Sequence, residues 1–259
     1  MKNVALITGA SSGIGKELAL IHADQKGDLV IVARRKEELE SLKKEIEKKY
    51  KVDVKIIVKD LTRENAPSEI YNELQQDGIE VDYLINNAGF GGLGKFHERE
   101  WAKDESMIKL NIFALTSLTR LFLPDFVKRN RGRILNVSST ASLIPGPLQA
   151  VYYATKAYVT SFSNAIAEEL YDTKVTVTAL LPGATETEFG KISGMDKTSM
   201  FQSTASAREV AEDGYKAMMQ GKLNKISGLS FGQNLMMAFV NVTPTKMIIK
   251  QVRKMQEVR

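Results

Sequence analysis

The chain has 259 residues, 43% of them hydrophobic, with no cysteine and only two histidines. This length and composition suit one substantial core, while the missing cysteines exclude disulfide and thiol chemistry and fit a reducing compartment. His22 and His97 have no carboxylate partners at ligand spacing, so we expect no metal site, and packing or surface roles for both.

The formal net charge of +5 is concentrated near the C-terminal end. From Pro244 onward a single acid, Glu257, opposes five bases: Lys246, Lys250, Arg253, Lys254 and Arg259. No basic patch is interleaved with aromatic residues, so nucleic-acid binding is not expected. The segment can form a basic amphipathic helix with an apolar stripe of Met247, Ile248, Val252 and Met255. We favour a docking helix with a solvated face; the alternative is contact with an acidic membrane surface or an acidic carrier.

The N-terminal end is predicted to form a core strand and not a signal peptide. No apolar run is expected to approach membrane-spanning length. We therefore expect a cytoplasmic protein without a transmembrane segment.

Apolar strands alternate with helical segments along the chain. Helical periodicity is clear in the second such segment, where Leu39, Leu42 and Ile46 share one face. Strands separated by helices predict a Rossmann-like, doubly wound parallel α/β sheet of about seven strands with helices on both faces. With no repeat or linker, residues 1–259 are expected to be a single domain. The expected strands are Val4–Thr8, Leu29–Ala33, Val54–Val58, Tyr83–Asn86, Arg133–Val137, Val175–Leu181 and, more weakly, Lys225–Gly228.

The first strand leads into a glycine-rich turn, Gly9 to Gly15, and then into a helical stretch, Lys16 to Gln25. The spacing is T-G-x-x-x-G-x-G and not the commoner G-x-G-x-x-G. Glycines let the backbone approach a diphosphate closely, and a helix N-terminus offers unpaired N–H groups. A plain strand–helix turn could look the same, but this position in an alternating chain favours a dinucleotide site.

The end of the second strand reads Ala33-Arg34-Arg35. An NAD site places an acid near this point to bind the ribose 2′-hydroxyl, whereas guanidinium groups suit a 2′-phosphate. We therefore predict NADP(H), with Arg34 as the stronger contact and Ser11 and Ser12 as helpers. The alternative is an exposed helix start.

Three residues further along the chain predict acid–base chemistry. Lys156 follows Tyr152 by four residues, which places both on one helix face, and Ser139 follows an apolar strand. A phenol keeps its proton to about pH 10, and a neighbouring ammonium is expected to lower that pKa toward neutrality. Such a set suits proton transfer at an oxygen while a nicotinamide exchanges a hydride.

Together these motifs resemble the short-chain dehydrogenase/reductase family, over Lys2 to about Gly228. The matching features, in order, are TGASSGIG (Thr8 to Gly15), NNAG (Asn86 to Gly89), Asn111, Ser139, Tyr152, Lys156 and the PG-x-x-x-T run from Pro182 to Thr187. Tyr152 is selected over Tyr153 because only Tyr152 has Lys156 four residues on, and the family spacing selects Ser139 over Ser138.

The resemblance implies a role for each matching residue. Ser139 and Tyr152 would bind a carbonyl, Lys156 would hold the nicotinamide ribose and stabilise the phenolate, and Asn111 would relay protons through a water. Asn86 would shape its strand end and also line the cofactor. The implied cofactor contacts are Gly9, Ser11, Ser12, Gly13, Ile14, Gly15, Arg34, Arg35, Asp60 and Leu61 (adenine), Asn87, Ala88 and Gly89 (adenosine ribose), Tyr152, Lys156, Pro182, Gly183, Thr185 and Thr187 (nicotinamide carboxamide).

The resemblance also implies a homodimer or homotetramer, formed through the helices around Asp104–Leu118 and Val151–Tyr171. After Thr187, residues 188–205 read as a lid over an apolar pocket for an aliphatic or aromatic carbonyl compound or alcohol, with Phe189, Ile192, Met195, Met200 and Phe201. A basic extension, residues 229–259, carries the run LSFGQNLMMAFVNVTP past the usual last strand and puts a simple fatty-acid-synthesis ketoreductase role in doubt.

Three alternatives stay open. One is a non-catalytic NADP-binding regulator on the same fold, which would not need all four catalytic residues. The second is a membrane-surface lipid or acyl ketoreductase that works through the basic tail. The third, at the level of the fold, is a Rossmann methyltransferase, whose chemistry the arginine pair and the Tyr-x-x-x-Lys helix do not serve.

Overall fold

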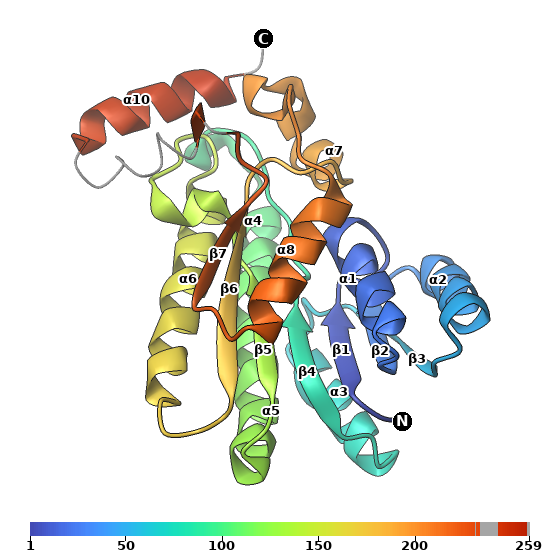
Figure 1. Cartoon of the computed structure of the whole chain (residues 1–259). Coiled ribbons are helices and arrows are strands. Elements are labelled where there is room, and N and C mark those ends of the chain that lie inside the picture. Colours follow the sequence, from blue (N-terminus) through green and yellow to red (C-terminus); the bar gives the residue numbers. More distant parts are fainter. Residues whose placement is uncertain (231, 234–242, 258–259) are drawn as a thin grey trace.

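The computed structural model describes residues 1–230, 232–233 and 243–257. At its centre lies a parallel sheet of seven strands in the order β3-β2-β1-β4-β5-β6-β7 (Figure 1). The strands are β1 (Val4–Thr8), β2 (Leu29–Ala33), β3 (Val54–Val58), β4 (Val81–Asn86), β5 (Arg133–Val137), β6 (Thr176–Pro182) and β7 (Asn224–Ser227). The predicted doubly wound α/β fold is confirmed.

Helices cover both faces of the sheet, because each strand is apolar on both sides and must be buried on both. One layer joins β1 and β2 to the buried faces of α1, α2 and α8. The other joins the opposite face to α3, α5 and α6. The main helices are α1 (Gly13–Asp24), α2 (Lys36–Tyr50), α3 (Ala66–Gln76), α4 (Trp101–Ile108), α5 (Leu115–Arg129), α6 (Ala150–Glu169), α7 (Phe189–Ser193), α8 (Ala207–Met219) and α10 (Thr245–Gln256).

The strand predictions agree closely with the structure, with shifts of one or two residues in three strands. β4 begins at Val81, two residues before the predicted start, and β6 and β7 are each displaced by one residue. Asp82 explains the early start of β4. Its carboxylate accepts a hydrogen bond from the Val4 backbone N–H at 3.0 Å and pairs with Arg131 at 2.9 Å, so an acidic residue is accommodated inside a strand.

The expectation about membrane-spanning length is wrong. Residues Trp101–Arg129 form one continuous helical stretch of 29 residues, with a mean hydropathy of 1.3 in its most apolar window. It consists of α4, a π-helical segment η2 (Lys109–Ala114) and α5. Leu118, Phe122 and Phe126 are buried against the sheet. By length and composition alone this helix could span a membrane, a test that buried core helices also pass.

The C-terminal helix α10 (red in Figure 1) lies across the carboxyl-terminal end of the sheet, near α7. Val252 is buried with Tyr152 and Tyr153, and Ile248 packs against the same cluster. Met247 is 63% exposed, so it does not belong to the predicted apolar stripe. The docking interpretation of this helix therefore fits the described residues. Much of the preceding run LSFGQNLMMAFVNVTP, at 231 and 234–242, and Arg259 lie outside them.

Candidate active site

A cavity of about 380 Å³ opens at the carboxyl-terminal edge of the sheet. It lies where β1 is flanked by β2 on one side and β4 on the other, the point at which the strand order reverses and doubly wound sheets bind their ligands. Nearly all predicted site residues line it. These are Gly9, Ser11, Ser12, Gly13, Ile14, Arg34, Arg35, Asp60, Leu61, Asn87, Ala88, Gly89, Ser139, Tyr152, Lys156, Pro182, Gly183, Thr185 and Thr187.

Gly15 does not line the cavity. It packs against the inner side of the glycine turn, close to Gly9 and Asn87. A Cβ atom at this position would collide with the Gly9 carbonyl oxygen and with Asn87 Nδ2. Asn87 Nδ2 in turn donates to the carbonyls of Thr8 and Gly9, at 2.9 and 3.2 Å. The turn and the end of β4 are therefore locked together, and the open N-terminus of α1 faces the cavity. This arrangement fits a diphosphate.

Arg34 and Arg35, the two arginines predicted to bind the 2′-phosphate of NADP(H), differ in their surroundings. Arg35 is paired with Glu188, with Nη2 and Oε2 2.8 Å apart, and it also donates to Ser11 Oγ at 3.1 Å. Arg34 is exposed beside Asp60. Burial raises the pKa of Asp60, but hydrogen bonds from Thr62 and the nearby Arg34 outweigh it, so the pKa is lowered overall. Arg34 is thus the better-placed group for a 2′-phosphate.

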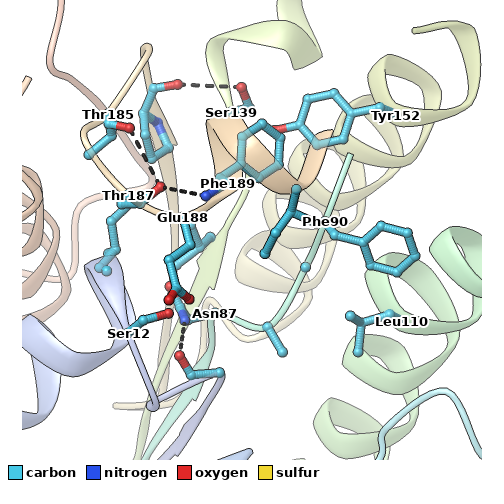
Figure 2. A pocket seen from close by; sticks show the side chains of 18 of the residues that line it. Ser12, Asn87, Phe90, Leu110, Ser139, Tyr152, Thr185, Thr187, Glu188 and Phe189 are labelled. Carbon is cyan, nitrogen blue, oxygen red and sulfur yellow. Dashed lines mark hydrogen bonds between the residues drawn. The ribbon is translucent and has the colours of Figure 1, made fainter. Parts of the chain in front are cut away.

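Ser139 and Tyr152 face each other at the other end of the cavity (Figure 2). Ser139 begins the short helix η3 (Thr140–Leu143), where its Oγ accepts from the Ala141 N–H at 3.1 Å and donates to the Pro182 carbonyl at 3.4 Å. These contacts fix the serine hydroxyl beside the phenol.

Lys156 lies one helical turn from Tyr152 on α6, with Nζ 5.8 Å from the centre of the phenol ring. Its Nζ donates to the Val137 carbonyl at 2.8 Å. Burial raises the pKa of Tyr152 to about 12, opposed by the Ser139 hydrogen bond, and burial lowers the pKa of Lys156 to about 8. The expected lowering of the phenol pKa is therefore not found in this structure, because desolvation dominates and the ammonium is directed to a backbone carbonyl.

Asn111 lies in η2, outside the cavity lining. Its side chain brackets Phe90: Oδ1 accepts from the Phe90 N–H at 3.1 Å, and Nδ2 donates to the Phe90 carbonyl at 3.0 Å. Gly89 fits between this amide and Lys156, since a Cβ there would lie 3.0 Å from Asn111 Oδ1 and 3.4 Å from Lys156 Nζ. Asn111 thereby positions the loop that carries Gly89 between the sheet and α6.

The adjacent candidates have separate structural roles. Ser138 Oγ is bonded to the Lys156 carbonyl and to Thr160, at 2.9 and 2.7 Å, so it anchors α6. Tyr153 OH accepts from Gln256 Nε2 of α10 at 2.6 Å. Asn86 is buried and donates to Asn136 and Thr119, and it does not line the cavity. The prediction that Asn86 also lines the cofactor is therefore wrong, because its amide points into the layer between β5 and α5.

The residues after β6 form the wall opposite the glycine turn. Gly183 N–H donates to the Ser227 carbonyl at 2.8 Å, which extends the β6–β7 pairing past Pro182. Thr187 Oγ1 accepts from the Phe189 N–H at 3.2 Å and lies beside the Thr185 carbonyl (Figure 2). Phe189 places its ring 5.3 Å from that of Tyr152, so the start of α7 covers the phenol.

Sequence reasoning missed several polar residues of the cavity: Lys59, Thr62, Thr140, Gln149 and Glu188. Gln149 is buried, and its Oε1 has no hydrogen-bond partner among the described residues. Glu188 directly follows the predicted contact Thr187, a signal that could have suggested it.

Within the described part of the chain, no group of three or more histidine, cysteine or carboxylate residues could hold a metal ion. His22 packs inside the core, hydrogen-bonded to Tyr215 and the Asn3 carbonyl.

The fold and the cavity define a doubly wound α/β domain with a ligand site at the reversal of its strand order, and comparison with known proteins identifies its family. A family model described as short chain dehydrogenase matches residues 3–197, and the chain belongs to that family. It is 32% identical to a structure described as a short-chain dehydrogenase from Sphingobium yanoikuyae in complex with NADPH, with a TM-score of 0.83 and 92% of each chain covered.

Two curated relatives are informative. The chain is 36% identical over 189 residues to an NADP-dependent 3-hydroxy acid dehydrogenase of Schizosaccharomyces pombe, covering 72% of this chain and 73% of the relative. It is 34% identical over 196 residues to the very-long-chain 3-oxoacyl-CoA reductase of Homo sapiens, covering 73% of this chain and 61% of the relative. The chain thus matches less than two thirds of the length of that reductase.

Proposed function

We propose that the protein interconverts a carbonyl compound and the corresponding secondary alcohol, with Ser139, Tyr152, Lys156 and Asn111 as its catalytic set. Bound NADPH would supply the hydride for reduction, or NADP⁺ would accept it for oxidation. The observation that carries the proposal is the arrangement of the Ser139 and Tyr152 side chains, which face each other in the wall of the cavity (Figure 2).

In reduction, the Ser139 hydroxyl holds the substrate carbonyl oxygen and Tyr152 donates its proton to that oxygen as the carbon is reduced. A pKa of about 12 keeps Tyr152 protonated at neutral pH, as an acid requires. The positively charged Lys156 Nζ then stabilises the negative charge that develops on the phenol oxygen. Asn111 positions Phe90 and Gly89 and is assigned to the route by which Tyr152 recovers its proton. Oxidation uses the same groups in reverse.

The proposed substrate is an apolar carbonyl compound. Phe90, Phe189, Ile192, Met195 and Phe201 line the part of the cavity near Tyr152. Residues 188–205, which carry four of these side chains, are proposed as the substrate lid. The relatives described above are named for reactions at the third carbon of an acid or an acyl thioester. A 3-oxoacyl or 3-hydroxyacyl group is therefore the first class to screen.

Tyr152→Phe tests the mechanism. The variant removes the transferred proton but keeps the ring, so turnover should fall by a factor of about 10²–10⁴ while NADPH still binds. Tyr153→Phe is the matched control, because that phenol faces Gln256 and not Ser139. Near-normal turnover in Tyr152→Phe, or an equal loss in both variants, would rule out the assignment.

A further inference from the structure

The first residue of the proposed lid, Glu188, directs a carboxylate into the cofactor end of the cavity. Its Oε1 accepts from Arg35 Nη1 at 2.9 Å and its Oε2 accepts from Nη2 at 2.8 Å, a bidentate ion pair. Hydrogen bonds from Arg35 and then from the Ser12 side chain hold the pKa of Glu188 below its usual range. Figure 2 shows this carboxylate beside Ser12 and Asn87.

This position is one that an anion should occupy. Ser12 precedes α1, and the first N–H groups of that helix lack partners within the helix. Ser12 and Arg35 line the same cavity and Ser11 joins them through its bond to Arg35. The Glu188 carboxylate therefore occupies the place beside Ser12 and Arg35 where the glycine turn would bind a diphosphate.

We propose that Glu188 is an internal competitor of the cofactor diphosphate, and that NADP(H) binds by displacing its carboxylate from Ser12 and Arg35. The ion pair is suited to exchange, because its side chains are 43% and 48% exposed and solvent weakens their attraction. A carboxylate left beside a diphosphate would repel it, so the two anions exclude each other.

Displacement of Glu188 would also act on the substrate end of the cavity. Glu188 immediately precedes α7, and the next residue, Phe189, contacts the Tyr152 ring and stacks on Phe201 at 6.3 Å. A backbone shift that accompanies the departure of the carboxylate from the glycine turn would move Phe189 as well. The cofactor would therefore bind first and reposition the apolar lid for the substrate.

Glu188→Gln tests the proposal by removing the charge while keeping the shape. Its affinity for NADPH and for NADH should both rise, by about fivefold, because both cofactors carry the diphosphate. Glu186→Gln is the matched control: Glu186 lies two residues earlier, is exposed and does not line the cavity, so its affinities should stay within twofold of the original chain. Fluorescence titration of the cofactor-free protein measures all of these affinities.

Unchanged or weaker binding in Glu188→Gln would overturn the proposal, since Glu188 would then be neutral or would close over the bound cofactor. A gain for NADPH alone would also overturn it, because that result places the competition at the 2′-phosphate. Thermal unfolding checks that each variant is folded. If Glu188→Gln does not fold, Glu188→Ala, which also removes the carboxylate, should give the same gain for both cofactors.

Discussion

At the scale of single residues, the proposed catalytic centre is governed by desolvation. Tyr152 and Lys156 are both buried, and burial favours the neutral form of each: it raises the pKa of the phenol to about 12 and lowers that of the ammonium to about 8. Lys156 is held by the Val137 carbonyl, so its position does not depend on its charge alone. In the proposed reduction, Tyr152 would therefore act from its protonated form.

The lowered pKa of Lys156 predicts a pH dependence of stability. Between about pH 8 and its ordinary pKa of 10.5, the unfolded chain binds a proton at Lys156 that the native chain does not, so this residue makes the free energy of unfolding rise with pH. Tyr152 acts in the opposite direction only above pH 10. Relative to Lys156→Met, the original chain should gain up to about 2 kcal/mol from pH 8 to pH 10.

Urea unfolding at pH 8, 9 and 10 measures this difference. Lys174→Met, at an exposed position, is the control and should parallel the original chain. A constant difference between the original chain and Lys156→Met across these pH values would show that the Lys156 pKa is not lowered in the native state.

At the scale of elements, α10 is joined to the active-site helix by a buried polar contact. Gln256 is fully buried; it donates to Tyr153 OH at 2.6 Å and accepts from Gln149 Nε2 at 3.3 Å. Gln256→Ala leaves both buried groups short of a partner and should lower the free energy of unfolding by about 1–3 kcal/mol. Lys250→Ala, on the exposed side of α10, should change it by less than about 0.5 kcal/mol. Chemical unfolding compares them, and equal effects would contradict the docking role of α10.

The elements also show which parts of the molecule could be predicted from the sequence. Strands such as Leu29–Ala33 are continuous apolar runs, and a local signal is enough to locate them. Asp82 concealed the start of β4, because the groups that satisfy its carboxylate come from Val4 and Arg131, far away in the sequence. The π-helical segment around Asn111 likewise depends on its packing against Phe90 and Thr155.

The residues of the candidate site likewise include some that could be located from the sequence and others that could not. Residues within motifs, such as Ser139 and Tyr152, could be located because their spacing reflects local geometry. Gln256 could not, since its role depends on Tyr153, a partner from a distant segment. The position of Glu188 next to Thr187 could have suggested that it lines the cavity, but its pairing with the distant Arg35 could not be predicted. The pKa of Tyr152 differs from the prediction for a related reason. The position of a lysine in the sequence does not indicate how strongly burial will desolvate the phenol.

At the scale of the whole molecule, we propose that two copies associate through α5, α6 and the end of η2. Phe113 and Tyr158 are 44% and 37% exposed, although both are large and apolar. Tyr158 stacks on Phe162 and is bonded to Thr116, at 3.0 Å, so the two helices present one continuous surface. An exposed aromatic patch of this kind is typical of an interface.

Tyr158→Glu should convert the proposed dimer into a monomer, because a buried unpaired carboxylate opposes association. Tyr171→Glu is the control: this tyrosine is 82% exposed and lies beyond the end of α6, so its oligomeric state should not change. Size-exclusion chromatography with light scattering gives the mass of each. A monomeric original chain, or an unchanged assembly in Tyr158→Glu, would contradict the proposed interface.

The central claim is that the cavity at the carboxyl-terminal edge of the sheet binds NADP(H), with Arg34 at the 2′-phosphate. Fluorescence titration with NADPH and NADH, repeated on Arg34→Asp, tests it most directly. Arg63→Asp, exposed nearby but outside the cavity lining, is the control. We expect the original chain and the control to prefer NADPH and Arg34→Asp to lose that preference, by about tenfold or more. Equal binding of the two cofactors by the original chain, or an unchanged preference in Arg34→Asp, would contradict the claim.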